Sequence, residues 1–276
     1  MFKSFRRLGA KIRQRSLKIP FFVPCSIMLI EDITSDKASK IIGKIDTLVL
    51  PVGTVEAHGP HCSVASDIIV PVRMAEEIEK LAGDRILVAP IIPYGHTWHL
   101  KDNPGSHDVS GEILTEYVFE VLKGFYSAWK VKYAIILNGH GGNDHVLALA
   151  AERAASLGLK VIVVDWWSGP FFEALNKIVP DSNGHAGEAE TSLVWNVGEK
   201  YVDASIIPKE DHIRPENDAI VGFSNVFDPK FTAIILPDAY AGRPSRASRE
   251  KGRRLNEESA RLIVELIDKF RSGKLS

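Results

Sequence analysis

A short segment of this 276-residue chain combines acids and imidazoles in a pattern that suits a divalent cation. Glu56 and His58 lie two residues apart, so in an extended backbone both side chains project to the same side. Asp67 adds a second carboxylate eleven residues after Glu56. A carboxylate and an imidazole that converge with another carboxylate can bind a borderline or hard divalent ion. Because a Glu-x-His triplet is common, a polar loop without metal is the alternative interpretation.

Two later segments could complete such a site. The run NGHGGN (138–143) surrounds His140 with three glycines directly after an apolar stretch, and glycine lets backbone approach whatever the histidine touches. A phosphate-binding turn is the alternative, but the run has neither the Walker Lys-Ser/Thr pair nor G-x-G-x-x-G spacing. The run HAGEAETS (185–192) places Glu190 near the start of a predicted helix. An acid is expected there for the helix dipole alone, so this motif needs the others for support.

The elements that must position these motifs alternate between strands and helices. Strands are predicted over 46–51, 85–92, 133–137 and 160–164, with a late strand over 233–236, and helices over 70–81, 110–129, 144–157, 188–197 and 249–270. Short apolar strands alternating with helices indicate an α/β fold with a mainly parallel sheet covered on both faces. Ligands of such a sheet bind beyond the carboxyl ends of its strands, where three of the motifs fall.

Composition limits the class of protein. Apolar residues make up 45% of the chain, enough for a sizeable core, and the formal net charge of -1 gives no reason to expect a nucleic-acid partner. Two cysteines are too few for a disulfide framework, so a reducing, cytoplasmic setting is expected. The long polar segment 203–228 is interpreted as an insertion or lid within one domain.

The N-terminus is basic and then apolar, an order that resembles a signal peptide. Pro20 and Pro24 interrupt the apolar run, no cleavage site follows, and the run is too short to span a bilayer. We therefore interpret residues 1–27 as a basic N-terminal extension or a misassigned start, and residues 28–276 as a single domain. No membrane partner is expected.

Taken together, PVGTVEAHGPH (51–61) with Asp67, NGHGGN and HAGEAETS resemble the creatininase family of metal-dependent amidohydrolases, over about residues 28–197. The resemblance implies a three-layer α/β/α sandwich, a homo-oligomer that is commonly a hexamer, and a proton-transfer role for His185. It also implies a set of metal ligands, with Asp67 bridging two ions: Glu56, His58, Asp67, His140 and Glu190. Two divalent ions would offset the three carboxylates and leave +1, which one hydroxide cancels, whereas a single ion would leave -1. One or two ions of Zn, Mn or Fe are therefore expected.

The match departs from the creatinine-hydrolysing members of that family. Those members carry an aromatic residue and a glutamate directly after the histidine that matches His140, where this chain has Gly141 and Gly142. They also carry a tryptophan at the position of Asp181. Creatinine is therefore not the expected substrate. The GHGGN form resembles other branches, which include a formamide-cleaving deformylase and a hydrolase that opens a cyclic inositol-derived ketone.

Four further residues are candidates for contact with a small-molecule substrate. His96 and Ser106 lie in a loop that follows a predicted strand, and loops there can carry function. Trp166 and Trp167 follow the fourth strand and could form a flat wall for a ring. A core or subunit-interface pair of aromatic residues is the alternative for the two tryptophans.

The resulting hypothesis is a metal-dependent hydrolase that uses metal-bound hydroxide to cleave a C–N amide bond, in a cyclic amide or a formamide. Opening of a cyclic polyol-derived ketone at a C–C bond, as in inositol catabolism, is the main alternative, since the same chemistry serves both. A metal-binding but non-catalytic subunit is a second alternative. This alternative fits the sequence less well, because a metal site without catalytic function would not need the proton-transfer residue His185.

Overall fold

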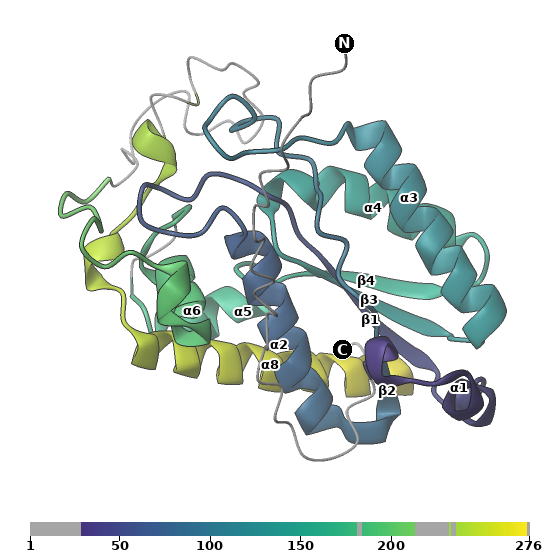
Figure 1. Ribbon diagram of the computed structural model, residues 1–276. Coiled ribbons are helices and arrows are strands. Elements are labelled where there is room, and N and C mark those ends of the chain that lie inside the picture. Colours follow the sequence, from purple (N-terminus) through teal and green to yellow (C-terminus); the bar gives the residue numbers. More distant parts are fainter. Residues whose placement is uncertain (1–28, 181–183, 213–231, 233–235, 275–276) are drawn as a thin grey trace, which may run out of the picture.

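The computed structural model describes residues 29–180, 184–212, 232 and 236–274. Within these ranges, four parallel strands form one sheet in the order β2-β1-β3-β4. The strands are β1 (Thr47–Val52), β2 (Ile86–Val88), β3 (Tyr133–Asn138) and β4 (Lys160–Asp165). Helices cover both faces of this sheet (Figure 1), so the predicted three-layer α/β/α sandwich with a parallel sheet is confirmed.

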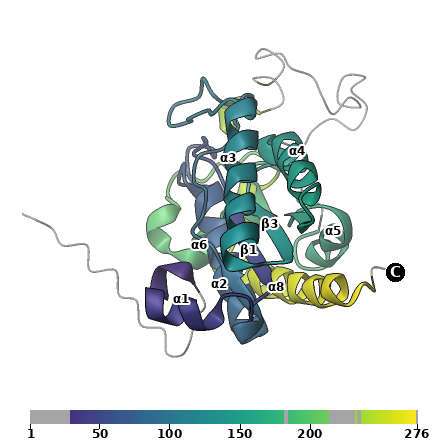
Figure 2. The ribbon, with the colours of Figure 1, turned by 90° about the vertical axis from the view of Figure 1, so that its right-hand side faces the viewer.

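Strands β1 and β2 are buried on both faces and β3 nearly so, as expected for a parallel sheet between helices, whereas β4 at the edge of the sheet is mostly half-buried. In β1, Leu48 and Leu50 point into the core cluster beneath α3 (Gly111–Gly124) and α4 (Asp144–Ala155), whereas Val49 points into the opposite cluster. This alternation follows from the two-residue period of a strand. Figure 2 shows α4 beside α3, with α8 below them on the other face of the sheet.

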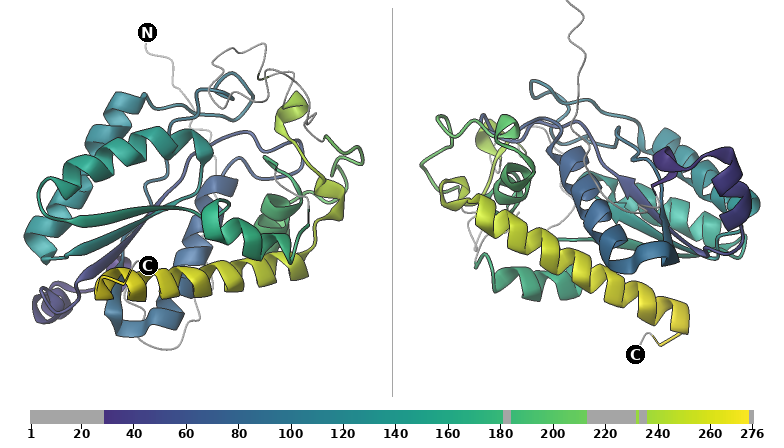
Figure 3. Two further views of the ribbon diagram at one scale, coloured as in Figure 1. Left: turned by 180° about the vertical axis from the view of Figure 1, so that it is seen from behind. Right: turned by 60° about the horizontal axis from the view of Figure 1, so that its bottom comes forward.

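The second face is covered by α2 (Ser66–Ala82), α6 (Glu188–Val197) and α8 (Arg249–Ser272). The long helix α8 packs along α6 and α2 (Figure 3) and buries Leu255, Ile263 and Ile267 against the sheet. Ser248 caps its start by accepting a hydrogen bond from the backbone N–H of Lys251.

Several boundaries differ from those predicted. The helix predicted over 110–129 ends at Gly124 and continues as one π-helical turn, Phe125–Trp129, which stops at Lys130 in a left-handed conformation. The strand predicted over 85–92 is shortened to β2. Helices α1 (Ser35–Ile41) and α5 (Gly169–Asn176) were not predicted, because both are short. Short 3-10 turns span Ile30–Asp32, Gly83–Arg85, Gly141–Asn143, Glu199–Tyr201, Pro237–Ala239 and Pro244–Arg246.

Some predictions fall outside the described residues. The N-terminal extension 1–27, most of the polar segment 203–228 and the late strand over 233–236, apart from its last residue, lie there. The division of the chain at residue 28 therefore stays a prediction. Among the described helices, none has the length and hydropathy needed to cross a bilayer.

Candidate metal centre

The three motifs meet at the carboxyl ends of β1 and β3. Glu56 and His58 lie in the loop after β1, and His140 follows β3 by two residues. Asp67 lies in the first turn of α2, which begins four residues earlier than predicted, and Glu190 lies in the first turn of α6. The sheet and two helix starts thus bring together side chains that are far apart in the sequence.

Asp67 stands between two imidazoles. Its Oδ1 lies 2.9 Å from His58 Nε2, and its Oδ2 lies 3.0 Å from His140 Nδ1. Glu56 Oε2 is 3.3 Å from His140 Nδ1, and Glu190 Oε2 is 3.7 Å from His58 Nε2. The five side chains therefore form two groups that share Asp67. Glu56, Asp67 and His140 make up one group, whose ligand atoms could hold a metal ion. In the other group, His58 lies beside the carboxylates of Asp67 and Glu190, and His58 also belongs to a possible metal-binding set with Glu56 and His185.

His58 Nε2 and Asp67 Oδ2 are buried, and apart from the ion-pair contacts given above they make no hydrogen bond among the described residues. Burial opposes a charge on His58, yet Asp67, Glu190 and Glu56 together raise the pKa of His58 to about 10. The carboxylates thus require positive charge at this point. A divalent cation would supply that charge and satisfy both atoms, so the residues fit a metal.

Backbone carbonyls fix which nitrogen of each imidazole faces Asp67. His58 Nδ1 lies 3.0 Å from the carbonyl oxygen of Glu56, and His140 Nε2 lies 3.1 Å from the carbonyl oxygen of His96. Each ring therefore donates an N–H to a carbonyl and turns its other nitrogen toward the carboxylate, and in the neutral ring that nitrogen has a lone pair that a cation could accept. Such carbonyl partners are typical of histidines that bind metal, because they set the tautomer and the ring orientation.

Two glycines of the predicted motifs make room for Asp67. A side-chain carbon on Gly53 or Gly139 would overlap the backbone carbonyl oxygen of Asp67. That carbonyl receives no helical bond from position 71, because Pro71 has no N–H. The first turn of α2 can therefore approach the ends of β1 and β3 closely, which places the Asp67 carboxylate between the two histidines.

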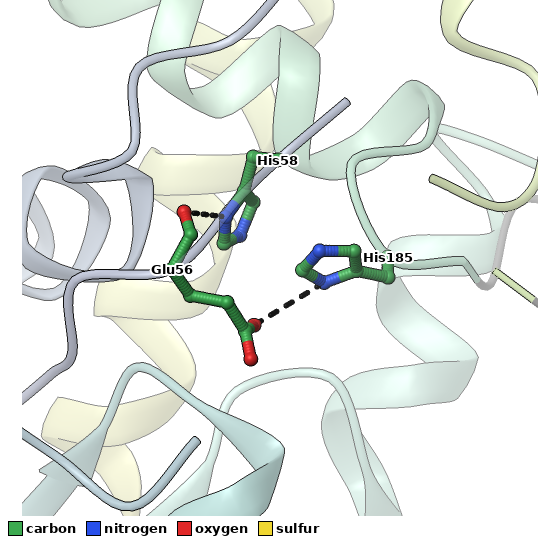
Figure 4. A group of neighbouring side chains, drawn as sticks. All are labelled: Glu56, His58 and His185. Atoms are coloured by element: carbon green, nitrogen blue, oxygen red, sulfur yellow. Dashed lines mark hydrogen bonds and ion pairs between the residues drawn. The ribbon is translucent and has the colours of Figure 1, made fainter. Parts of the chain in front are cut away.

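His185 lies next to the cluster (Figure 4), where its ring points toward the Glu56 carboxylate. Its Nε2 is 2.7 Å from the carbonyl oxygen of Ala57, and its Nδ1 is 3.7 Å from Glu56 Oε2. Burial, with the nearby charge of His58, lowers the pKa of His185 to about 4. A neutral ring that donates from Nε2 turns the lone pair of Nδ1 toward the site. The same position would also allow a ligand role with Glu56 and His58.

The four candidate substrate residues differ in where they lie. Ser106 Oγ accepts a hydrogen bond of 3.0 Å from the backbone N–H of Ala57, so this side chain supports the Glu56–His58 segment. His96 Nδ1 lies 3.0 Å from the carbonyl oxygen of Val109. Trp166 is only 3% exposed and packs in the core, which fits the alternative interpretation. Trp167 is half-buried and lies beside Gly141, where a side-chain carbon on the glycine would be 3.9 Å from Trp167 Cζ2. A contact between Trp167 and substrate stays a prediction.

Sequence reasoning missed several residues that support the cluster. The hydroxyl of Thr97 donates a hydrogen bond to Glu56 Oε1. The side chain of Asn143 accepts from the backbone N–H of His96 at 2.8 Å and lies 3.3 Å from the carbonyl oxygen of Gly53, so it links two loops of the site. The position of Asn143 inside NGHGGN was a signal for such a role, whereas nothing in the sequence marked Thr97.

Gly142, at the position where the sequence departs from the glutamate of the creatinine-hydrolysing proteins, is closely surrounded in this structure. A side-chain carbon at Gly142 would overlap the carbonyl oxygen of His96 and Nε2 of His140. The carbonyl of His96 therefore occupies the space that a side chain on residue 142 would need. The other position at which this chain departs from those proteins, Asp181, lies outside the described residues.

An α/β sandwich that carries two acid–imidazole groups around a shared carboxylate defines a metal-dependent hydrolase. The family model described as creatinine amidohydrolase matches residues 31–267, and the chain belongs to the creatininase family. The predicted family and the predicted class of enzyme are therefore confirmed.

Three similar proteins show the range of this likeness. A 3-dehydro-scyllo-inosose hydrolase of Thermotoga maritima is 27% identical over 273 residues, which cover 89% of this chain and 85% of that protein. A creatinine amidohydrolase of Pseudomonas putida is 25% identical over 244 residues, covering 80% and 88%. A solved structure of manganese creatininase has a TM-score of 0.74 at 22% identity, covering 88% of this chain and 98% of the other.

Proposed function

We propose that this chain hydrolyses a C–N amide bond, in a cyclic amide or a formamide, at a centre of two divalent cations. Glu56, Asp67 and His140 would hold one cation, and His58, Asp67 and Glu190 would hold the second. The observation that carries this proposal is the position of Asp67, whose two oxygens each face a different imidazole. A carboxylate with one oxygen toward each group is suited to bridge two ions.

Divalent ions bound here would polarise a substrate carbonyl and lower the pKa of water from about 15.7 toward 7. His185 transfers the proton from the attacking water to the leaving group. Its Nδ1 faces the site as a lone pair and takes a proton from the attacking water, and it then delivers that proton to the leaving nitrogen. The carbonyl of Ala57 holds the ring in place throughout, because it keeps its bond to Nε2.

The metal identity proposed is Zn, Mn or Fe. Imidazole and carboxylate ligands suit these ions, and creatininase structures of similar fold include a manganese form and a zinc–zinc form.

We also propose that the protein is cytoplasmic. We further propose that it is a homo-oligomer, because the family commonly forms hexamers. Exposed apolar side chains that line one shallow hollow, Tyr94, Ile113 and Tyr117, support an interface between subunits.

A second candidate function is the opening of a cyclic polyol-derived ketone at a C–C bond. The inosose hydrolase of Thermotoga maritima, which aligns with 89% of this chain, favours it. Activated water can attack the sp2 carbon of a ketone as well as that of an amide, so the ligands do not separate the two reactions. Creatinine is disfavoured as a substrate, because Gly141 and Gly142 replace an aromatic residue and a glutamate.

Metal analysis combined with a substrate panel tests the proposal. Purified protein is expected to contain divalent metal and to lose turnover on chelation. Turnover is expected to return when one kind of divalent ion is added back. Formamides, cyclic amides and oxidised inositols are assayed in parallel. Turnover of only the inositols would select the second candidate, and metal binding without any turnover would indicate the non-catalytic subunit.

Glu190→Gln is the matching test of the ligand set, with Glu199→Gln as control. Glu190 faces His58 in the buried cluster, whereas Glu199 forms an exposed ion pair with Arg249. The Glu190 variant is expected to lose about one bound ion per chain together with turnover, and the control to lose neither. Unchanged metal content in the Glu190 variant would remove this residue from the ligands.

A further inference from the structure

Ala186, which lies between His185 and α6, has an unusual backbone conformation. Its φ is 50°, in the left-handed region that residues with a side chain rarely adopt, and it is fully buried. A strained residue keeps such a conformation only when its surroundings hold it, and strain of this kind gathers at functional sites. The contacts of Ala186 therefore indicate what the conformation serves.

Both peptide groups that flank Ala186 are held by side chains from the first turn of α6. Its N–H donates to Glu190 Oε2 at 2.6 Å, and its carbonyl oxygen accepts from the hydroxyl of Thr191 at 3.0 Å. Thr191 Oγ1 lies 2.9 Å from His61 Nε2. Since the hydroxyl donates its hydrogen bond to the carbonyl of Ala186, it accepts a hydrogen bond from His61 Nε2. Burial and the charge of His58 lower the pKa of His61 to about 4, in agreement with a neutral ring.

We propose that His61 and Thr191 are positioning residues that hold Ala186 in its left-handed conformation and so aim the Glu190 carboxylate at His58. The inference rests on the proposed metal centre. Without the Thr191 hydroxyl, Ala186 relaxes toward the right-handed region, and its N–H turns away from Glu190. Glu190 then loses the hydrogen bond that orients it, and the cation held by His58, Asp67 and Glu190 binds more weakly.

The test compares Thr191→Val with Thr115→Val. Both substitutions remove a hydroxyl that donates to a backbone carbonyl, but Thr115 lies on α3 and bonds Val146, away from the site. Removing a group that orients a ligand typically lowers metal affinity about 10–100-fold. We expect that loss for the Thr191 variant in Mn²⁺ or Zn²⁺ titration against a chromophoric chelator, and no loss for the control. Thr191→Ser keeps the hydroxyl and should retain the affinity.

Ala186→Gly separates this role from a general packing defect. Glycine adopts the left-handed conformation without strain, so it should restore most of the affinity lost by Thr191→Val. Affinity of the Thr191 variant within about twofold of the Thr115 control would overturn the proposal. The proposal would also be overturned if Ala186→Gly restored none of the metal affinity that Thr191→Val loses. If Thr191→Val does not fold, His61→Gln, which keeps an N–H donor, and His61→Leu carry the same comparison.

Chemical denaturation of the metal-free protein makes the outcome independent of metal binding. If wild-type protein binds no cation, the proposed function fails, but the role of Thr191 can still be measured. We expect Thr191→Val to shift the denaturation midpoint less in the Ala186→Gly background than in the wild-type background, because the hydroxyl no longer has strain to oppose. Equal shifts in both backgrounds would contradict the proposed hold on Ala186.

Discussion

Replacing Gly142 with alanine tests whether close packing behind His140 sets the geometry of the metal centre. The added methyl group overlaps the carbonyl oxygen of His96 and Nε2 of His140. Neither group can move away freely. The backbone N–H of His96 is bonded to Asn143 at 2.8 Å, and the His140 ring is bonded to His96 at 3.1 Å. The substitution must therefore disturb the bond that orients His140.

The substitution should lower both the unfolding free energy and the metal affinity, and the expected size of each change can be given. Forcing extra volume into a packed region typically costs about 1–3 kcal/mol of unfolding free energy. Loss of the carbonyl that orients a histidine ligand lowers metal affinity about 10–100-fold. The neighbouring Gly141→Ala is the matched control, since the nearest atom to its added methyl is Trp167 Cζ2 at 3.9 Å, an ordinary contact. It should change unfolding free energy by less than about 0.5 kcal/mol.

Urea denaturation of the metal-free proteins and metal titration against a chelator measure the two effects separately. Gly142→Ala is expected to lose both stability and affinity, and Gly141→Ala to lose neither. If the two alanine variants behave alike in both assays, the packing of His96 on His140 has no role in metal binding.

Two further predictions concern His185 and Asp144. His185→Ala should keep its bound metal while turnover falls by about 10²–10⁴, as for loss of a proton-transfer group, with the exposed His145→Ala as control. Loss of metal instead would make His185 a ligand. Burial and the neighbouring Asp165 raise the pKa of Asp144 from 3.8 to about 6. At Asp144 the folded metal-free protein thus binds a proton that the unfolded chain releases, so the contribution of this residue to the unfolding free energy should fall as pH rises from about 4 to 6, opposite to the rise from His61 and His185, whose pKa values are lowered. Asp144→Asn should remove this fall and add about 1 kcal/mol at pH 7, after a discount for partial exposure. An unchanged pH slope in urea denaturation would refute this.

The sequence by itself determined the parallel sheet and the residue types of the site. Apolar runs such as 133–137 are too short for helices and too continuous for exposed strands, so burial on both faces follows from the pattern. The order of the three motifs along such a sheet also places them near its carboxyl edge. Both inferences depend on local periodicity and chain order, which the sequence contains directly.

Only the tertiary structure decided how the side chains of the site meet. The sequence could not show that the two oxygens of Asp67 face different imidazoles, or that Thr97 supports Glu56. It could not separate Trp166, which is in the core, from Trp167, which lies beside Gly141.

The physical reason is the same in each case. These contacts join segments far apart in the chain, and their geometry depends on how closely α2 and α6 pack against the strand ends. Alanine alone would avoid the left-handed conformation of Ala186, which depends on the nearby Thr191 and, through the hydroxyl of Thr191, on the distant His61. Local preference sets the elements, and packing between the elements sets the chemistry.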